Sequence, residues 1–306
     1  MEKINIETLL EVEKKYNLYR KEIWGIHYWM LLRFPFLQYN LWSSIYDLSP
    51  SLYSSMTKEE RTLDVYLQAF LKNNACEVLR KKKENILLIP HSIERKYYTD
   101  WMRSEYSIES LYYSYNKSLN CLKEKQLFKD GFYWEFLIWY KATKKLRIKE
   151  REELKKKILT DFHEPLKEMG KCCERDIDFN QFASSAMAIL YRARFLKKKY
   201  RKMLQRLKPS KIVEVCHYKL DTMIINNEAH QLGIPTIELQ HGTIHPEHFA
   251  YHYAIDELIP ELPRYICTYS EFWNSMLQMP LESTDLVATG STVFEEKILF
   301  FKKNIT

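Results

Sequence analysis

The chain has 306 residues and a mass of 37.1 kDa, and 46% of its residues are hydrophobic, which is enough for one large core or two modest ones. Glycine is scarce, with 6 residues, and aromatic residues make up 14%, so the composition disfavours a turn-rich β-sandwich and a glycine-rich nucleotide loop. The formal net charge is +7, and basic residues concentrate just after residue 80, in 141–157 and in 192–208. Such stretches fit either solvated helix faces or a surface for phospholipid headgroups or phosphorylated substrates.

The cysteine pattern and the N-terminus indicate a compartment. The six cysteines show no C-x-x-C pair and no spacing typical of a disulfide framework, and the first residues lack the apolar region of a signal peptide. We therefore expect a cytoplasmic protein in a reducing environment. The most apolar stretch, residues 23–42, is interrupted by polar residues, so the sequence predicts no membrane-spanning segment.

The first part of the chain is expected to be mostly helical. Residues 5–22 have an amphipathic pattern, residues 24–34 begin a second, mostly buried helix, and Thr57 with its two following acidic residues predicts the start of a third helix that runs through the lysines after residue 80. The first convincing strand is 85–90, an apolar run followed by His91 and Ser92. Residues 106–115 predict a weaker strand, 126–180 helices, and 182–207 one long helix ended by Pro209.

The rest of the chain alternates regularly. Strands are predicted at 211–216, 236–239, 264–268 and 286–289, and helices at 221–232, 271–278 and 293–303. Strands that alternate with helices of about ten residues are typical of βαβ units, so we expect an α/β fold with a Rossmann-like parallel sheet and helices on both faces. The predicted domains are a helical segment, 1–84, packed on the core; a Rossmann-like domain, 85–290; and a crossing helix, 291–306.

Polar residues follow three of the predicted strands. His91 and Ser92 follow the first strand, His217 follows 211–216, and His241 follows 236–239. Because ligands of open α/β sheets bind outside the carboxyl ends of the strands, we expect these histidines to converge on one site. A neutral imidazole at such a position can take a proton from a hydroxyl group near neutral pH, and the alternative is a buried histidine that only bonds to a loop carbonyl. Gly242 allows a sharp turn or close approach to a ligand.

Two other groups of residues are open to more than one interpretation. The histidines at 241, 245, 248 and 252 have a spacing that occurs in zinc sites on helices, but Pro246 interrupts the helical register and no cysteine is nearby, so we expect no metal. Glu214 and Glu238 lie inside strand runs, where a buried carboxylate needs a partner. Three interpretations stay open for each of these two glutamates: it orients a histidine, it serves as the catalytic base itself, or it points to a solvated edge of the sheet.

Several function classes are disfavoured by absent motifs. The sequence contains no G-x-G-x-x-G and no P-loop, so it predicts no nicotinamide, flavin or P-loop triphosphate site. The basic stretches lack the interleaved aromatic residues of an RNA-binding sheet, and we expect no nucleic-acid partner.

The segment 238–244, E-L-Q-H-G-T-I, with Pro246 and the F-A-Y of 249–251, resembles the Q-H-G-T segment of bacterial surface-polysaccharide glycosyltransferases of the GT-B fold. These enzymes make capsule, lipopolysaccharide and teichoic acid. The likeness extends loosely to residues 24–33, 85–92 and 287–291. It implies that the chain is the N-terminal, acceptor-binding half of a GT-B architecture, with the donor nucleotide held by a C-terminal domain that this chain lacks.

The resemblance implies an inverting, metal-independent glycosyltransferase in which His241 deprotonates the acceptor hydroxyl. The donor would be a nucleotide-activated sugar, the acceptor a saccharide or a lipid-linked saccharide at the inner face of the membrane, and no cofactor is implied. With the strand-end argument, it gives these substrate-binding candidates: His91, Ser92, Glu214, His217, Gln240, Gly242 and Thr243. Two alternatives stay open: a non-catalytic acceptor-binding subunit that needs a donor-domain partner, and a CDP-glycerol-type glycerophosphotransferase using the same histidine.

Overall fold

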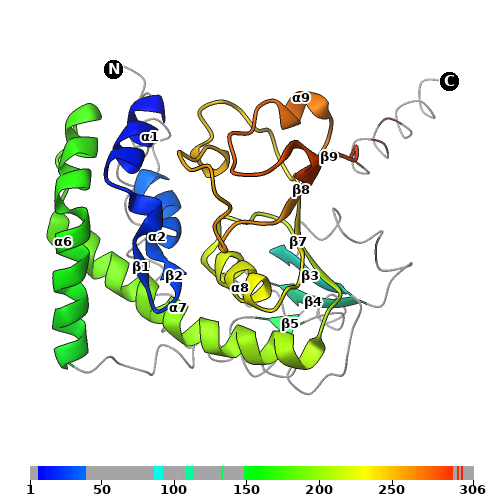
Figure 1. Ribbon diagram of the computed structural model, residues 1–306, viewed down its shortest axis with the longest axis horizontal. Helices are drawn as coiled ribbons and strands as arrows, with labels where there is room; N and C mark the ends of the chain where they lie inside the picture. Colours follow the sequence, from blue (N-terminus) through cyan, green and yellow to red (C-terminus); the bar gives the residue numbers. More distant parts are fainter. Residues whose placement is uncertain are drawn as a thin grey trace, which may run out of the picture.

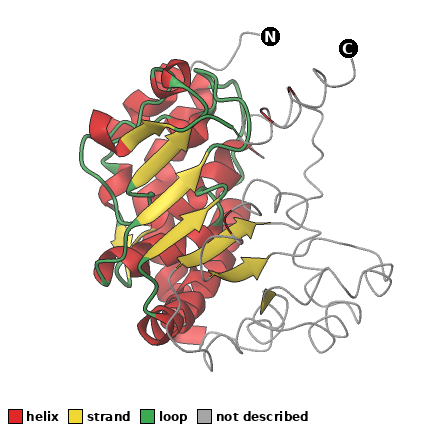
Figure 2. Cartoon of the chain, turned by 90° about the vertical axis from the view of Figure 1, so that its right-hand side faces the viewer, coloured by secondary structure: helices red, strands yellow, loops and turns green. Residues whose placement is uncertain are grey.

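The computed structural model describes residues 6–38, 86–91, 108–112, 132–133 and 148–291, together with Met102, Glu295 and Ile298. Its main element is a seven-stranded sheet with the order β5-β4-β3-β6-β7-β8-β9, in which every pair of neighbours is parallel (Figures 1 and 2). The strands are β3 (Ile86–His91), β4 (Ile108–Tyr112), β5 (Phe132–Tyr133), β6 (Lys211–Glu214), β7 (Thr236–Leu239), β8 (Tyr265–Thr268) and β9 (Leu286–Ala288).

The strand order reverses once. The chain adds β4 and then β5 on one side of β3, returns to the other side of β3 with β6, and continues outward to β9. This is the order of doubly wound α/β folds, in which ligands bind where the order reverses, here between the carboxyl ends of β3 and β6. The predicted α/β class and parallel sheet are confirmed.

Helices cover one face of the sheet. Leu87, Ile89 and Ile212 point from the strands into a core shared with α2 (Tyr28–Phe36), α7 (Phe179–Leu207) and α8 (Leu220–Gln231). In Figure 2 the strands lie in front of this helical layer. On the opposite face Ile86, Leu88 and Val213 pack with Met102. The predicted covering by helices is therefore seen on one face, and its counterpart on the other face falls outside the described residues.

The N-terminal segment packs on this helical layer but differs from its prediction. α1 (Ile6–Lys15) ends well before residue 22, because Asn17 adopts a left-handed conformation with φ 50°. A 3-10 turn, η1 (Leu18–Arg20), and a hairpin of β1 (Glu22–Ile23) and β2 (Ile26–His27) follow. Trp24 and Gly25 form the two-residue turn, both with positive φ, as tight hairpins require.

Two long helices follow the shorter strands of the sheet. α6 (Ile148–Cys172) packs against α1 and α7 (Figure 1). α7 begins three residues earlier than predicted, because the Asp178 carboxylate accepts hydrogen bonds from the backbone N–H groups of Asn180 and Gln181 and so caps the helix. It ends at Leu207, before a left-handed Lys208 and Pro209.

Two other predicted helices differ from the structure. Residues 132–133 form a strand where a helix was expected, and the helix predicted at 271–278 is only the four-residue α9 (Glu271–Asn274). Two 3-10 turns, η7 (Phe249–Tyr251) and η8 (Ser283–Asp285), complete the C-terminal part. Glu295 and Ile298 are helical, as predicted for 293–303. The helix predicted from Thr57 lies outside the described residues.

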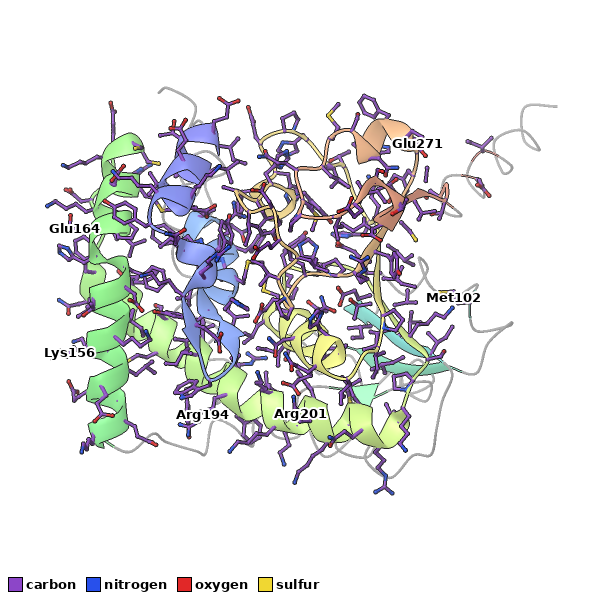
Figure 3. All side chains as sticks on the ribbon, viewed as in Figure 1. Met102, Lys156, Glu164, Arg194, Arg201 and Glu271 are labelled. Carbon is purple, nitrogen blue, oxygen red and sulfur yellow. The ribbon has the colours of Figure 1, made fainter. Side chains whose placement is uncertain are left out.

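The basic stretch of α7 packs beside α8 and ends close to the first residue of β6. Since α7 ends four residues before the first residue of β6, its basic C-terminal half lies at the edge where the strands begin. Arg194 and Arg201 lie along this helix in Figure 3. In the part of the chain that the structure describes, no helix is both long enough and apolar enough to span a membrane.

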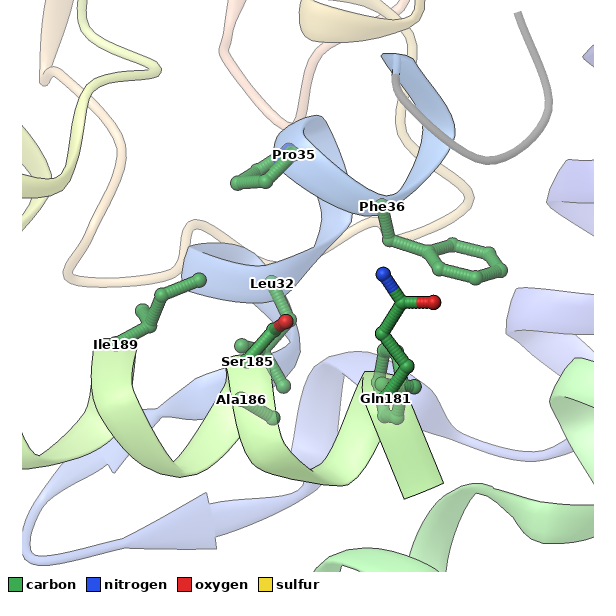
Figure 4. Close-up of a pocket in the computed structure, with 8 residues that line it drawn as sticks. Leu32, Pro35, Phe36, Gln181, Ser185, Ala186 and Ile189 are labelled. Carbon is green, nitrogen blue, oxygen red and sulfur yellow. The ribbon is translucent and has the colours of Figure 1, made fainter. Parts of the chain in front are cut away.

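A small cavity of about 50 Å³ lies between α2 and α7 (Figure 4). Ligand pockets usually measure ~300–1,000 Å³, so this cavity is too small for a sugar or nucleotide. It also contains none of the residues that follow the strands. Its lining consists of Leu32, Pro35, Phe36, Gln181, Phe182, Ser185, Ala186 and Ile189.

Candidate active site

The turn between β6 and α8 is held in one conformation. Cys216 is buried and has φ 78°, an uncommon conformation for a residue with a side chain, and it redirects the chain directly after the strand. The hydroxyl of Thr222 lies within 2.8–3.1 Å of the carbonyl oxygens of Cys216, His217 and Lys219 and closes the turn. The positions of His217 and Tyr218 are therefore set by backbone geometry and by a side chain of α8.

Glu238 of β7 is fully buried and bonded to His217. One carboxylate oxygen lies 2.6 Å from His217 Nδ1, and the other accepts bonds from the His217 backbone N–H at 3.2 Å and the Tyr251 hydroxyl at 3.0 Å. Burial alone would raise the pKa of Glu238, but the interactions with His217, and a smaller one with His241, lower the pKa below its ordinary value. Glu238 is therefore a buried, ionised carboxylate just behind the end of β7.

His217 is the centre of this network and has no exposed surface. Its Nε2 lies 3.1 Å from the hydroxyl of Tyr253, so both ring nitrogens have polar neighbours within the protein. A buried ring whose two nitrogens are both engaged cannot contact a substrate in this conformation. His217 was predicted to bind substrate, and the structure instead buries it between Glu238 and Tyr253.

Glu214 lies beside Glu238 in a different environment. The two residues are paired in the register of β6 and β7, and both are fully buried. Glu214 accepts one bond, at 2.8 Å, from the Asn226 amide of α8. Its other carboxyl oxygen has no hydrogen-bond partner among the described residues. Burial, together with the neighbouring charge of Glu238, raises the pKa of Glu214 well above its ordinary value despite the Asn226 bond, so the neutral acid is favoured. Glu214 was predicted to bind substrate, but because it is buried it cannot contact a substrate directly.

His241 follows β7 directly and is half-buried. Its Nε2 lies 3.3 Å from the hydroxyl of Tyr218, and its Nδ1 is buried. The ring of Tyr218 stacks on Phe34 of α2, with centroids 4.5 Å apart and an angle of 28° between the planes. His241 thus lies where the strand-end argument placed it, with Glu238 close enough to interact electrostatically.

The histidine loop, residues 241–252, does not form a helix. His245 and His248 have ring centroids 5.6 Å apart, but the ring of His252 lies with its Nδ1 3.0 Å from the carbonyl oxygen of His248. Burial and repulsion by His245 lower the pKa of His248 to about 4, so this ring is neutral at pH 7. Among the described residues, no three His, Cys, Asp or Glu side chains are arranged to hold a metal ion.

A buried arginine fastens the loop to the N-terminal helices. The guanidinium of Arg33 donates to the carbonyl oxygens of Phe249 and His252, the second at 2.8 Å. The same group donates to Glu13 of α1 at 2.6 Å, and Tyr19 also bonds to this carboxylate. The charge of Arg33 is therefore compensated within the core, and α1, α2 and the loop are held as one unit.

The remaining predicted site residues are placed as follows. Gln240 is buried and joins two loops, because its amide donates to the Gly242 carbonyl and accepts from the Tyr269 backbone N–H, each at 2.8 Å. Gly242 and Thr243 are exposed. Gly242 does not have a positive φ, and a methyl group added there would meet nothing within 4 Å. The turn itself therefore does not require glycine. His91 ends β3, but its side chain and the whole of Ser92 lie outside the described residues.

The sequence interpretation missed four residues that shape the site: Tyr218, Tyr251, Tyr253 and Arg33. The position of Arg33 carried a signal, because a lone charge in an apolar helix must find a buried partner. Tyr251 belongs to the F-A-Y that accompanies the Q-H-G-T segment, whereas nothing in their spacing distinguishes Tyr218 and Tyr253 among the 22 tyrosines of the chain.

Comparison of the chain with protein-family models, with curated proteins and with solved structures gave no match in any of the three. Function is therefore inferred from the geometry of this site and from the likeness of residues 238–244 to the Q-H-G-T segment.

Proposed function

We propose that this chain is the acceptor-binding part of an inverting, metal-independent glycosyltransferase of the GT-B type that builds bacterial cell-surface polysaccharide. One observation carries the proposal: half-exposed His241 lies at the carboxyl end of β7, with the ionised carboxylate of Glu238 buried nearby. This is the edge at which doubly wound sheets bind ligands. The Q-H-G-T segment that resembles such transferases occupies this same position.

The proposed reaction uses His241 as a general base. The acceptor hydroxyl gives its proton to the imidazole, and its oxygen attacks the anomeric carbon of the donor sugar. As the new carbon–oxygen bond forms, the bond to the nucleotide phosphate breaks and the nucleotide leaves with that electron pair. Attack from the face opposite the leaving group inverts the anomeric centre.

Glu238 supports this reaction through its charge. His241 becomes a cation when it accepts the proton, and a nearby buried carboxylate stabilises that cation more strongly than water would. The interaction between the two groups is already visible in the pKa of Glu238, which His241 helps to lower. Glu238 is thus a positioning and electrostatic group, held in place by His217 and Tyr251.

The proposed location is the cytoplasmic face of the membrane, where lipid-linked acceptors are found. The basic half of α7 suits an anionic surface, but it lies at the edge of the sheet opposite His241. A membrane bound there would therefore lie away from the active site, and the acceptor would have to extend to the other edge.

A transfer assay on the complete enzyme, in which the donor-binding part accompanies this chain, tests the proposal with membrane-derived acceptors and UDP-, CMP-, CDP- and GDP-activated donors. We expect His241→Gln to lower kcat by about 100-fold, which is typical for loss of a general base. The matched control is His230→Gln, which changes the same residue type at an exposed position of α8 and should leave transfer unchanged. Activity should also persist in EDTA.

Full activity of His241→Gln would contradict the proposed base. Transfer of glycerol phosphate from CDP-glycerol, and of no sugar, would instead indicate a glycerophosphotransferase. If no donor is used while acceptor is bound, the non-catalytic alternative is supported.

Gly242→Ala asks whether a ligand approaches this loop closely. Because Gly242 has an unstrained backbone and open space around it, the substitution should change the free energy of unfolding by less than about 0.5 kcal/mol. If the acceptor lies against this backbone, the added methyl group should raise KM. An unchanged KM would show that the acceptor binds elsewhere.

A further inference from the structure

Tyr218 is held rigidly at the centre of an aromatic cluster. Its ring stacks on Phe34 and lies edge-on to His217 at 5.4 Å and to Tyr251 at 6.0 Å between centroids. These neighbours come from α2, from the turn after β6 and from η7. A tyrosine ring packed between α2, η7 and its neighbour in the turn has little rotational freedom, so the position of its hydroxyl is restricted.

That hydroxyl faces the reactive side of His241. Nδ1 of His241 is buried, so a proton from a bound acceptor can reach the ring only through Nε2. The Tyr218 oxygen lies 3.3 Å from this Nε2. A neutral imidazole is a base only at the nitrogen that carries no hydrogen, and the hydrogen bond to that nitrogen decides which tautomer is populated.

We propose that Tyr218 is a positioning residue for His241: its hydroxyl donates to Nε2 and thereby keeps the proton on Nδ1 and the basic lone pair on Nε2. This inference rests on the proposed role of His241 as the base. When the acceptor hydroxyl donates to Nε2 in place of Tyr218, its proton moves to Nε2 and its oxygen forms the new bond. The tyrosine oxygen then accepts from the Nε2–H of the imidazolium, so one side chain stabilises both states.

Other titratable groups surround the pair. Glu238 faces it from β7, His217 and Lys219 come from the same turn, His248 and Tyr251 belong to the loop, and Arg33 belongs to α2. His248 is neutral at pH 7, and Arg33 is paired with Glu13. Tyr218 is the group for which the structure shows a direct hydrogen bond to Nε2 of His241.

Nitrogen NMR of the histidine rings tests the inference without any substrate. Long-range proton–nitrogen spectra of the ¹⁵N-labelled full chain report the tautomer of each histidine, and His241→Gln assigns the signal. In the unmodified protein we expect His241 to be mainly the Nδ1–H tautomer. Tyr218→Phe should change its tautomer ratio by about five-fold, the effect of one net hydrogen bond.

Tyr253→Phe is the matched control, because it removes the hydroxyl that lies within hydrogen-bond distance of Nε2 of His217 rather than of His241. It should move the His217 signals and leave those of His241 in place. An unchanged tautomer ratio in a folded Tyr218→Phe protein would overturn the inference. If that variant does not fold, a predominant Nε2–H tautomer of His241 in the unmodified protein would overturn it equally.

Transfer kinetics separate this inference from the proposed function. With an active donor, Tyr218→Phe should lower kcat by about ten-fold and leave KM unchanged, because the base is misoriented while the acceptor site is intact. Equal kcat values would contradict the positioning role. If the complete enzyme transfers nothing, the proposed function fails, and the NMR result on this chain still decides whether Tyr218 sets the tautomer.

Discussion

Glu214 and Glu238 are the same residue type at the same level of adjacent strands, yet the structure shifts their pKa values in opposite directions. Both are fully buried on the face covered by α8 and the histidine loop. Glu238 is surrounded by three N–H and O–H donors, and its pKa is lowered. Glu214 has one amide donor, and its pKa is raised well above its ordinary value. Burial alone therefore does not determine the charge of a carboxyl group. The electrostatic interaction of Glu238 with His217, together with its hydrogen bonds, outweighs burial, and Glu214 has no such partner among the described residues.

The difference arises from the turn after β6 and not from the neighbouring strands. In the register an isoleucine flanks each glutamate on its outer side, Ile89 for Glu214 and Ile266 for Glu238, whereas the turn presents His217 to Glu238 alone. Two negative charges on strands about 4.8 Å apart would repel each other in the core. Ionisation of Glu238 thus favours the neutral form of Glu214, and the pair carries one negative charge.

The largest expected effect comes from Glu238→Gln. The amide keeps the shape of the side chain, but it replaces one acceptor oxygen by an NH₂ group. That NH₂ group then faces a hydrogen-bond donor of His217 or Tyr251, and neither of the two facing donors is satisfied. An unsatisfied buried group of this kind costs about 2 to 3 kcal/mol, and we expect the free energy of unfolding, measured with urea, to fall by that amount at pH 7.

Glu214→Gln is the matched control, since it makes the same change one strand away. If Glu214 is neutral in the folded protein, the amide replaces a neutral acid there, and the unfolded chain no longer gains free energy by ionising this group. The free energy of unfolding at pH 7 should therefore not fall, and we expect it to rise. Equal losses in the two variants would show that the glutamates have the same charge state, and the comparison above would be wrong.

Tyr251→Phe should have a smaller effect. It removes one of the three donors to Glu238 and leaves both bonds from His217. A hydrogen bond to a charged group contributes about 1.5 kcal/mol or more, so we expect a loss near that value in urea unfolding at pH 7. In the Glu238→Gln background the same substitution should cost less, because the acceptor is then uncharged. Strict additivity of the two substitutions would contradict a direct contact between these side chains.

The sequence was sufficient for the parts of the fold that depend on local pattern. The apolar runs that became β3 and β7 are short, rich in β-branched or aliphatic residues and followed by polar residues, so their type and ends were predictable. His241 was predictable for the same reason. The predicted helices that correspond to α1 and α9 were too long. Turn-forming conformations, such as that of Asn17, are decided by single residues rather than by periodicity.

The site could be predicted only in part, because its chemistry depends on contacts between distant segments. The sequence indicated that a buried Glu238 needs a partner, but it did not show that this partner is His217. Nor did it show that Glu214 lacks a histidine partner among the described residues. The role of Arg33 depends on a contact with residues more than 200 positions later in the chain. Such contacts are set by the order of strands, which a single sequence does not reveal.

The smallest effect, and the most direct view of the two glutamates, is expected in the pH dependence of stability. A carboxyl whose pKa is lowered by folding stabilises the protein above its unfolded pKa and loses that contribution as the pH falls through the folded value. A carboxyl whose pKa is raised has the opposite slope: the unfolded chain releases its proton first, so stability falls as the pH rises above the unfolded pKa. In the native chain the contributions of Glu238 and Glu214 oppose each other around the ordinary glutamate pKa. Glu214→Gln removes the falling contribution, so above the unfolded glutamate pKa of about 4.3 the unfolding free energy of this variant should rise more steeply with pH, or fall less, than that of the unmodified protein. Urea titrations at closely spaced pH values measure this slope. A shallower slope in Glu214→Gln would mean that Glu214 is ionised in the folded protein, and that the buried pair carries two charges rather than one.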